Sequence, residues 1–299
     1  MRALNDRTVT LTVTSPPYFN AMDYTQYDGA GTDKHRSRTY ANGFDSYAAY
    51  LGLMQRIFSE VFRVTVPGGH AAVVVGSIQH EGRCYPIPQD LTRRLQDIGW
   101  EFHQQIIWYK GTSVCDRAGT LIQHPFPGYY YPNCTHEVVL VFRKPGPKLY
   151  RHSDDDTKDA SRVPITPLVL RDIVNDIWAI PPVPSKAVDH PCPYPAELVQ
   201  RLVMLYSHKG DLVLDPFCGS ATTGQLANAM GRGFTGYETE KRFVDAGRSR
   251  LREPLEIKER SLVIKLDHIE GDPFLHAGQE HVATRTPLSR PRPKSRSRS

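Results

Sequence analysis

Paired cysteines are missing from this chain. Its five cysteines among 299 residues are Cys84, Cys115, Cys134, Cys192 and Cys218, and no two of them form a Cys-x-x-Cys pair. An odd and scattered set of this kind argues against structural disulfides and a zinc site, and it favours a reducing cytosol. We therefore expect a cytoplasmic protein without a metal centre.

Long apolar runs are missing as well. No stretch is apolar enough to span a bilayer, and Met1–Thr8 lack the apolar core of a signal peptide. The sequence also shows no internal repeat. We therefore expect no membrane partner and, at 299 residues, one sizeable core.

Excess charge is confined to the C-terminal end. The net charge is +5, and an acid-free stretch supplies +6 through Arg285, Arg290, Arg292, Lys294, Arg296 and Arg298, which leaves −1 for the rest. Any affinity for nucleic acid must therefore come from a local patch. Because the chain is rich in Ser, Arg and Pro from about Pro287, we expect residues 271–299 to form a basic, disordered tail.

What the chain does contain is an alternation of strand-like and helix-like segments. Apolar runs predict strands at Val9–Val13, Ala71–Val75, Gln105–Trp108 and Val138–Phe142. Helices are predicted over Tyr47–Phe62, Gln89–Ile98, Ala196–Ser207, Thr223–Met230 and Lys241–Leu251. This order predicts an α/β fold with a mostly parallel, doubly wound sheet. We assign residues 1–270 to one domain, with inserted loops at 111–133 and 143–174.

The first motif, Ser15-Pro16-Pro17-Tyr18, follows the first predicted strand. Neither proline can donate a backbone hydrogen bond, so the strand must stop there and the chain must turn outward. The tip would present a hydroxyl, backbone carbonyls and an aromatic ring, which suits the exocyclic amine of a flipped nucleobase. These residues alone leave open a proline-rich turn after an edge strand.

The second motif begins at Asp215 and reads Asp-Pro-Phe-Cys-Gly-Ser-Ala-Thr-Thr. It indicates the end of a buried strand, a turn of small residues that a ligand can approach closely, and a helix start capped by Thr222 or Thr223. The next strand, Gly233–Tyr237, ends at Glu238. In nucleotide-binding sheets an acid at this position holds the ribose hydroxyls.

With both motifs, the chain resembles the amino-group DNA methyltransferases, which transfer a methyl group from S-adenosylmethionine (AdoMet) to cytosine N4 or adenine N6. Further matching segments are Val66–Gly69, Ile106–Lys110, Thr135–Phe142, Asp176–Pro182, His190-Pro191 and Tyr194-Pro195. The resemblance runs from about Val9 to Leu251. A catalytic motif that precedes the AdoMet loop is the circularly permuted order of the family's beta group. The resemblance therefore implies a Rossmann-like, AdoMet-dependent methyltransferase fold.

The resemblance also implies roles for individual residues. The catalytic residues would be Ser15, Pro16, Pro17 and Tyr18. Residues near AdoMet would be Thr14, Asp215, Pro216, Phe217, Gly219, Ser220, Thr222, Glu238, His190 and Pro195. In the family, target recognition lies between the His136–Phe142 strand and the Asp176–Pro182 segment, so Arg143–Val174 is the better candidate for base reading. The predicted DNA contacts are Lys110, Arg117, His124, Tyr129, Tyr130, Arg143, Lys148 and Arg151.

Serine at the first catalytic position is the family's usual choice for cytosine N4, so we expect a site-specific cytosine-N4 methyltransferase acting on double-stranded DNA. Adenine N6 is the first alternative, and a catalytically inactive DNA-binding relative is the second. The resemblance further implies a partner restriction endonuclease that acts separately, and a monomer or homodimer. Methylation at cytosine C5 is rejected, because Pro191-Cys192 is followed by Pro193 rather than glutamine.

Two departures from the family pattern bear on the site. Ala221 stands where the AdoMet loop usually has a second glycine, a change that costs little if the backbone is right-handed. Only Met1–Thr8 precede the catalytic strand, where the family has a further element. Either the start is truncated, or Ser261–Leu266 with Gly271-Asp272 supplies the missing strand from the C-terminus, and we favour the second alternative.

Overall fold

The structure is a computed structural model, and it describes residues 1, 3–19, 44–111, 126–128, 134–151, 153–166, 168–183, 194–253 and 255. All of them belong to one compact unit, Met1–Val263. Ser261–Leu266, Gly271-Asp272 and the basic tail lie outside the described residues. Among the described helices, none combines the length and apolarity that a membrane span requires.

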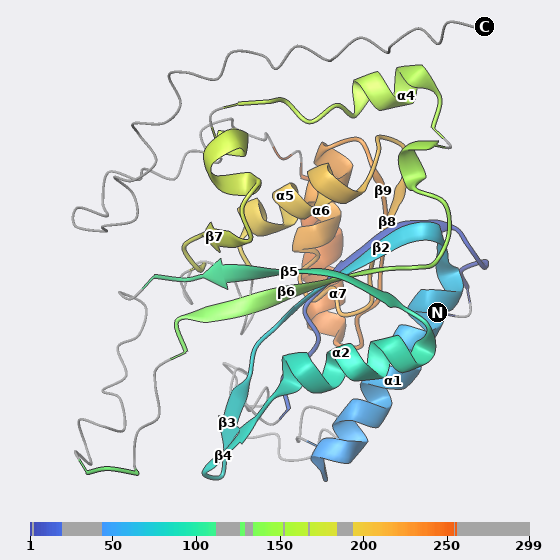
Figure 1. Ribbon diagram of the computed structural model, residues 1–299. Coiled ribbons are helices and arrows are strands. Elements are labelled where there is room, and N and C mark those ends of the chain that lie inside the picture. Colours follow the sequence, from blue (N-terminus) through green and yellow to red (C-terminus); the bar gives the residue numbers. More distant parts are fainter. Residues whose placement is uncertain are drawn as a thin grey trace, which may run out of the picture. The chain divides into compact units, whose positions relative to one another are not determined.

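A seven-stranded sheet forms the centre of this unit (Figure 1). Its order is β7-β5-β6-β2-β1-β8-β9. The strands are β1 (Val9–Thr14), β2 (Thr65–Val75), β5 (Glu101–Tyr109), β6 (His136–Arg143), β7 (Ile177–Ala179), β8 (Leu212–Asp215) and β9 (Gly233–Gly236). A separate hairpin consists of β3 (Ile78–His80) and β4 (Arg83–Tyr85).

Strand direction in the sheet is mostly parallel, as predicted. The pairs β1–β2, β1–β8, β8–β9 and β5–β7 are parallel, and only β6 runs antiparallel to its neighbours β2 and β5. The carboxyl ends of the parallel strands therefore share one edge, which we call the carboxyl edge; the arrow of β5 points to it in Figure 1. Because β6 is reversed, its last residue, Arg143, lies at the opposite edge.

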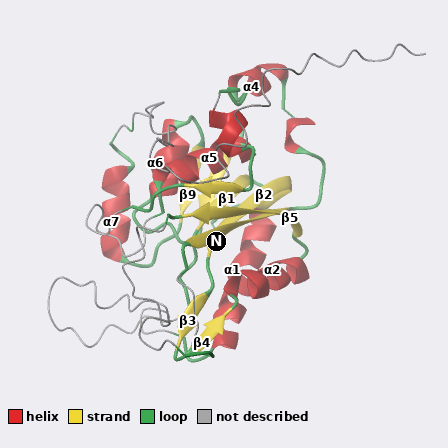
Figure 2. Ribbon diagram, turned by 60° about the vertical axis from the view of Figure 1, so that its left-hand side comes forward, coloured by secondary structure: helices red, strands yellow, loops and turns green. Residues whose placement is uncertain are grey.

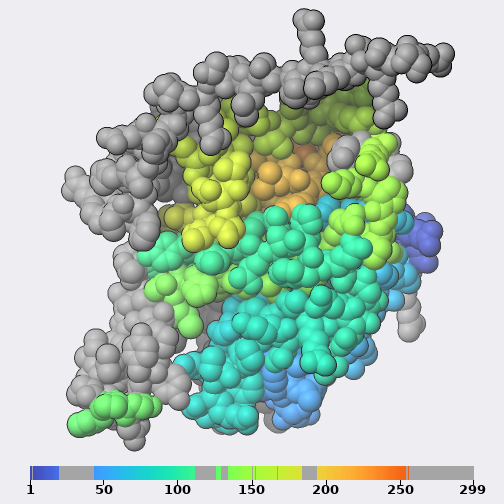
Figure 3. All heavy atoms as spheres, in the orientation of Figure 1, coloured from blue at the N-terminus to red at the C-terminus, as the bar shows by residue number. Residues whose placement is uncertain are grey.

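Helices cover both faces of the sheet (Figures 1 and 2). One face packs on α1 (Tyr47–Val64) and α2 (Ile87–Ile98), with Phe58 and Leu91 completely buried. The other packs on α5 (Ala196–Tyr206) and α6 (Thr222–Ala229), with Leu202 completely buried. In the space-filling view the light blue and teal segments lie below the yellow and orange segments (Figure 3). The doubly wound α/β fold is confirmed.

Most predicted elements agree with the structure to within a few residues. Helices α1, α2, α5, α6 and α7 (Lys241–Arg250) occupy the predicted ranges. Short elements in the 143–174 segment were not predicted, namely η1 (Leu149–Arg151), α4 (Asp155–Ala160) and the π-helical η2 (Val169–Ile173). The β3–β4 hairpin was also not predicted.

Strand β2 is longer than predicted because the Val66–Gly69 turn is part of it. The register against β1 passes from Val9↔Thr65 to Leu11↔His70, so the strand carries an irregularity there. Gly68 has φ +83°, and a Cβ at this position would lie 1.9 Å from the carbonyl oxygen of Pro147. Only glycine fits so close to the neighbouring backbone.

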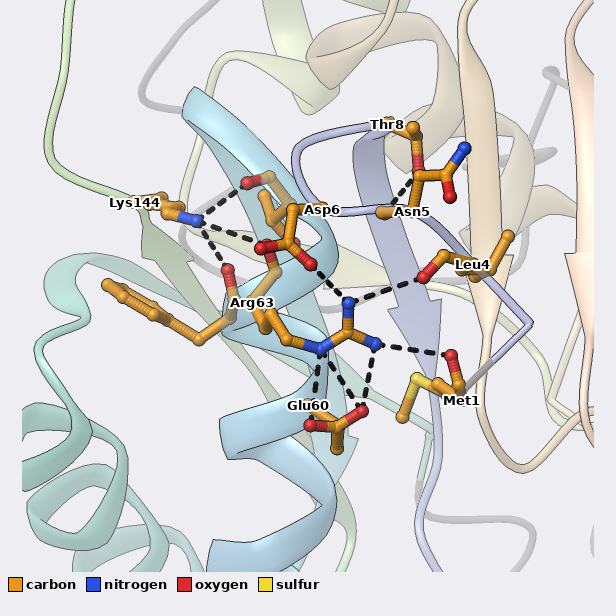
Figure 4. Close-up of polar contacts among 10 residues, drawn as sticks. Met1, Leu4, Asn5, Asp6, Thr8, Glu60, Arg63 and Lys144 are labelled. Carbon is orange, nitrogen blue, oxygen red and sulfur yellow. Dashed lines mark hydrogen bonds and ion pairs between the residues drawn. The ribbon is translucent and has the colours of Figure 1, made fainter.

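Polar contacts secure the edge opposite the carboxyl edge (Figure 4). Arg63, near the end of α1, donates to the carbonyl oxygens of Met1 and Leu4 at 3.2 Å each, and it pairs with Asp6 and Glu60. Lys144 donates to the carbonyl oxygens of Phe62 at 2.5 Å and Thr65 at 2.8 Å. Arg63 therefore ties the N-terminal residues to α1. Lys144 satisfies the carbonyl group of Phe62, which the end of α1 leaves without a partner in the helix.

Candidate active site

The two sequence motifs come together at the carboxyl edge. Strand β1 pairs with β8 in parallel through Leu11↔Val213 and Thr12↔Leu214, so the segments that follow the two strands emerge side by side. Ser15 to Tyr18 follow β1, and the loop from Pro216 to Ser220, which we call the AdoMet loop after its predicted role, follows β8. In open α/β sheets this is where ligands bind.

The predicted catalytic tetrapeptide is anchored by the residue that follows it. Pro16 is buried, whereas Ser15, Pro17 and Tyr18 are partly exposed. The next residue, Phe19, is only 4% exposed, and its ring centroid lies 4.9 Å from that of Tyr85 and 5.3 Å from that of Tyr47. Phe19 therefore anchors the chain just after the motif. The sequence analysis did not single out Phe19, although an aromatic residue directly after the motif was a usable signal.

Asp215 lies in the interior rather than on the surface of the site. Its side chain is completely buried and accepts four hydrogen bonds. Oδ1 accepts from Thr14 Oγ1 at 2.6 Å and from the Phe217 backbone N–H at 3.1 Å. Oδ2 accepts from Tyr194 Oη at 2.7 Å and from Thr223 Oγ1 at 2.8 Å. The predicted cofactor residues Thr14 and Asp215 thus bond to each other.

Glu238 lies next to the AdoMet loop, as predicted. Its Oε2 accepts from the Gly219 N–H at 3.0 Å, and its Oε1 accepts from the N–H groups of Thr239 at 2.7 Å and Glu240 at 2.8 Å. The side chain is only partly buried. A carboxylate has about four acceptor positions, so one remains for a hydroxyl group. The residues present therefore fit a ribose at the tip of β9.

Arg250 of α7 donates hydrogen bonds to the end of the AdoMet loop and to the start of α6. It donates to Ser220 Oγ at 3.2 Å, to Thr222 Oγ1 at 3.1 Å and to Gln225 Oε1 at 2.9 Å. Burial lowers the pKa of Arg250. This guanidinium therefore orients the hydroxyls of Ser220 and Thr222, which are predicted to lie near AdoMet. The sequence did not predict these contacts, because Arg250 lies 28–30 positions away from the two residues.

The remaining predicted cofactor residues occupy varied positions. Pro216 is buried, Phe217 is partly exposed, and Pro195 is buried at the start of α5. His190 lies outside the described residues. The backbone at Ala221 is left-handed, with φ +61° and ψ +39°, so the right-handed conformation considered for this alanine is wrong.

Burial controls the ionisation of the site. It raises the pKa of Asp215, against the lowering effect of the hydroxyl donors Thr14, Tyr194 and Thr223. It also raises the pKa of Tyr194, so the phenol stays protonated and donates. Burial raises the pKa of Cys218 to about 12, which keeps this residue a thiol at neutral pH rather than a nucleophilic thiolate.

The predicted DNA contacts divide between the two edges of the sheet. Lys110 follows β5 at the carboxyl edge, where it pairs with Glu137 and lies 4.4 Å from the Trp108 ring centroid. Arg143 lies at the opposite edge and pairs with Glu101 at 2.5 Å. Arg117, His124, Tyr129 and Tyr130 lie outside the described residues.

The described part of the 143–174 segment begins far from the site. Five residue steps along β6 lead from Val138, near the carboxyl edge, to Arg143, a span of about 17 Å. Lys148 and Arg151 follow within a few residues. Ser161 Oγ then accepts from the N–H of Lys209, which precedes β8 at the same opposite edge. Arg143, Lys148 and Arg151 are thus not gathered with the predicted catalytic residues.

The model of a known protein family matches most of the chain. The sequence model of the family described as DNA methylase, N6_N4_Mtase, matches residues 9–249. The type II methyltransferase M.MthZI of Methanothermobacter thermautotrophicus is 29% identical over 286 residues, covering 90% of this chain and 79% of its own length. The orphan methyltransferase M.BamHII of Bacillus amyloliquefaciens is 26% identical over 284 residues, covering 86% and 94%.

Solved structures agree with this match. The putative DNA modification methylase TTHA0409 of Thermus thermophilus, in complex with S-adenosyl-L-methionine, has a TM-score of 0.64 at 28% identity, over 84% of this chain and 88% of its own. The PvuII cytosine-N4-specific DNA methyltransferase has a TM-score of 0.58 at 19% identity, over 87% and 85%. At that identity the second likeness shows the fold alone.

Proposed function

The chain belongs to the N6/N4 DNA methylase family and uses AdoMet, and from this premise we propose that it methylates the exocyclic N4 of a flipped cytosine at specific sites in double-stranded DNA. One observation carries the proposal. Ser15 is partly exposed at the end of β1, beside the loop that follows β8. Serine at this position is the usual choice of cytosine-N4 enzymes in the family that the chain resembles.

In the proposed reaction Ser15 orients the amine nitrogen of the base and need not act as a general base. The lone pair of an aromatic amine is delocalised into its ring, so the nitrogen is a poor nucleophile. One amine hydrogen donated to Ser15 Oγ and one to the Pro16 carbonyl oxygen favour a pyramidal nitrogen, with its lone pair directed at the reacting carbon. Pro16 suits this role because it is buried and therefore rigid.

Bound AdoMet supplies an electrophilic methyl group. Attack by the amine nitrogen on that methyl carbon would break the carbon–sulfur bond and would leave its electron pair on sulfur. The methylated nitrogen is cationic and strongly acidic, so its proton passes to water without a prior base. Tyr18, partly exposed beside Ser15, stacks on the extruded base and offsets the few kcal/mol of unstacking.

Nucleoside analysis tests the choice of base. DNA from cells that express the protein is digested to nucleosides and separated by mass, with Ser15→Ala as the control. N4-methylcytosine in the wild-type sample alone supports the proposal. N6-methyladenine would assign the alternative adenine-N6 activity, and the absence of both, together with no AdoMet binding, would favour an inactive DNA-binding relative.

A role in restriction–modification is the second part of the proposal. One relative is named a type II methyltransferase and another an orphan methyltransferase. We place this chain with the first kind, as the modification enzyme that protects host DNA from a separate endonuclease. Sequencing of methylated positions gives the recognition sequence, and protection of every such site in the genome supports the role, whereas sparse methylation contradicts it.

A further inference from the structure

Both oxygens of the Asp215 carboxylate are fully used. Each accepts two hydrogen bonds, and a carboxylate offers about four acceptor positions in all. The group is also 0% exposed. No acceptor position remains for a ligand, so Asp215 acts through the residues that it holds.

The two oxygens hold different parts of the site. Oδ1 joins Thr14, the residue before Ser15, to the N–H of Phe217 in the AdoMet loop. Oδ2 is held from the other side by Tyr194, just before α5, and by Thr223 on α6. The hydroxyls of Tyr194 and Thr223 also lie within hydrogen-bond distance of each other. Four residues spread over positions 14 to 223 of the sequence, Thr14, Tyr194, Phe217 and Thr223, thus bond the same buried carboxylate of Asp215.

We propose that Asp215 and its three hydroxyl donors, Thr14, Tyr194 and Thr223, are positioning residues that set the spacing between Ser15 and the AdoMet loop. The inference rests on the proposed methyl transfer at Ser15. In-line attack requires the amine nitrogen and the methyl carbon to lie about 3–3.5 Å apart, and a misplacement of about 1 Å slows such reactions about a hundredfold. Oδ1 of Asp215 is the direct bridge between the segments that carry the two reactants.

Charge explains why the donors are hydroxyls. A buried carboxylate is strongly destabilised unless every acceptor position is satisfied, and each hydroxyl contributes a short, charge-assisted hydrogen bond without adding a cation. Loss of one donor leaves an unsatisfied lone pair in the interior. The Asp215 carboxylate is then expected to shift toward its remaining hydrogen-bond donors. This shift would move either β1 or the AdoMet loop.

Thr12 provides a matched control for Thr14. Both are completely buried threonines of β1, two residues apart. The Thr12 hydroxyl has no hydrogen-bond partner among the described residues. Thr12→Val therefore removes a buried hydroxyl that holds nothing, whereas Thr14→Val removes the one that bonds Asp215.

The experiment measures single-turnover methyl transfer, AdoMet affinity by calorimetry and unfolding in urea. We expect Thr14→Val to lower the transfer rate about 10- to 100-fold, with the dissociation constant for AdoMet changed less than threefold. Thr14→Ser keeps the hydroxyl and should restore most of the rate. Tyr194→Phe should lower the rate in the same way, and Thr12→Val should leave it within twofold of wild type.

Different results would overturn the inference. A Thr14→Val rate within twofold of wild type, or an equal loss in Thr12→Val, excludes positioning through Asp215. A loss of AdoMet affinity as large as the loss of rate assigns Thr14 to cofactor binding instead. If Thr14→Val does not fold, Tyr194→Phe decides by the same criteria. Failure of the proposed function is distinct, because the wild-type protein itself would then transfer no methyl group.

Discussion

The Gly219 N–H donates to Glu238 Oε2 at 3.0 Å, which joins the AdoMet loop to the tip of the neighbouring strand β9. The carboxylate also accepts from two further N–H groups, of Thr239 and Glu240. Three fixed donors orient the side chain before a nucleoside binds, so little conformational entropy is lost when the last acceptor position takes a ribose hydroxyl.

Glu238→Ala should weaken AdoMet binding by about 1.5–3 kcal/mol, the loss associated with a hydrogen bond to a charged group. Calorimetric titration measures this, and DNA binding without cofactor should be preserved. Asp245→Asn is the control, because Asp245 pairs with Lys241 on the exposed face of α7, and its substitution should leave AdoMet affinity unchanged. Unchanged affinity in Glu238→Ala would show that the ribose assignment is wrong.

Ser15→Ala should reduce the rate of methyl transfer about a hundredfold or more. The substitution leaves one amine hydrogen without its acceptor, so the nitrogen loses a preorganised contact that matters in the transition state. AdoMet affinity should change little, because Thr14 still bonds Asp215. Single-turnover assays measure the rate, and wild-type turnover in the alanine variant would remove Ser15 from the mechanism.

The sequence was sufficient to predict most of the sheet, the main helices that cover it, and the strand that each of the two motifs follows. The reason is physical: β1 and β8 are short apolar strands followed by residues that cannot extend them, and parallel neighbours end at one edge. Hydrogen bonds between residues far apart in the sequence could not be predicted. Nothing in the spacing of Tyr194 and Arg250 indicates that one bonds Asp215 and the other bonds Ser220 and Thr222.

The DNA-contact prediction for Arg143 shows a different limit. The order of motifs in the family predicted that the 143–174 segment reads the bases. The direction of the preceding strand, however, determines at which edge of the sheet that segment begins. Because β6 is antiparallel, Arg143 lies opposite the site and pairs with Glu101. The preceding connection, from β5 to β6, leaves at Lys110 and returns at His136, both at the carboxyl edge. Of the two inserted loops, 111–133 is therefore the one whose flanking residues, Lys110 and His136, lie at the carboxyl edge.

His70 should make the fold sensitive to acid. Burial, and then the neighbouring His103 and Arg143, lower its pKa to about 4, and its Nδ1 has no partner among the described residues. The unfolded chain binds this proton at about pH 6.5, so stability is present above that pH and is lost as pH falls toward 4. Lys148 and Glu101 also act on the adjacent His103, whose pKa burial lowers.

Urea unfolding at several pH values measures the effect. From pH 6.5 to 4.5 the wild-type protein should lose about 2 kcal/mol more stability than His70→Gln, at roughly 1.4 kcal/mol for each pH unit. The variant retains the carboxylates that titrate in the same range, so the difference isolates His70. Parallel curves for the two proteins would contradict the assignment.

Ala221 should tolerate glycine but not a branched side chain. Its φ of +61° costs alanine about 1–2 kcal/mol, and Ala221→Gly removes that strain. The gain is offset by the extra entropy of glycine in the unfolded chain, about 0.4–1 kcal/mol, and by the loss of one buried methyl group, about 0.8 kcal/mol. Ala221→Gly should therefore change the free energy of unfolding by less than about 1 kcal/mol.

For valine at position 221 no favourable term offsets the backbone strain. A β-branched residue in the left-handed region is an outlier, and a Cβ added at Gly247 of α7 would already lie 3.2 Å from the Ala221 Cβ, so the space is nearly filled. Ala221→Val should cost about 2 kcal/mol or more in urea unfolding. The cofactor measurement is the sharper one. Because Ala221 already has the backbone conformation that glycine favours, Ala221→Gly should bind AdoMet within threefold of wild type. A large gain in affinity would instead show that the alanine had impaired the site, as in the alternative of an inactive relative.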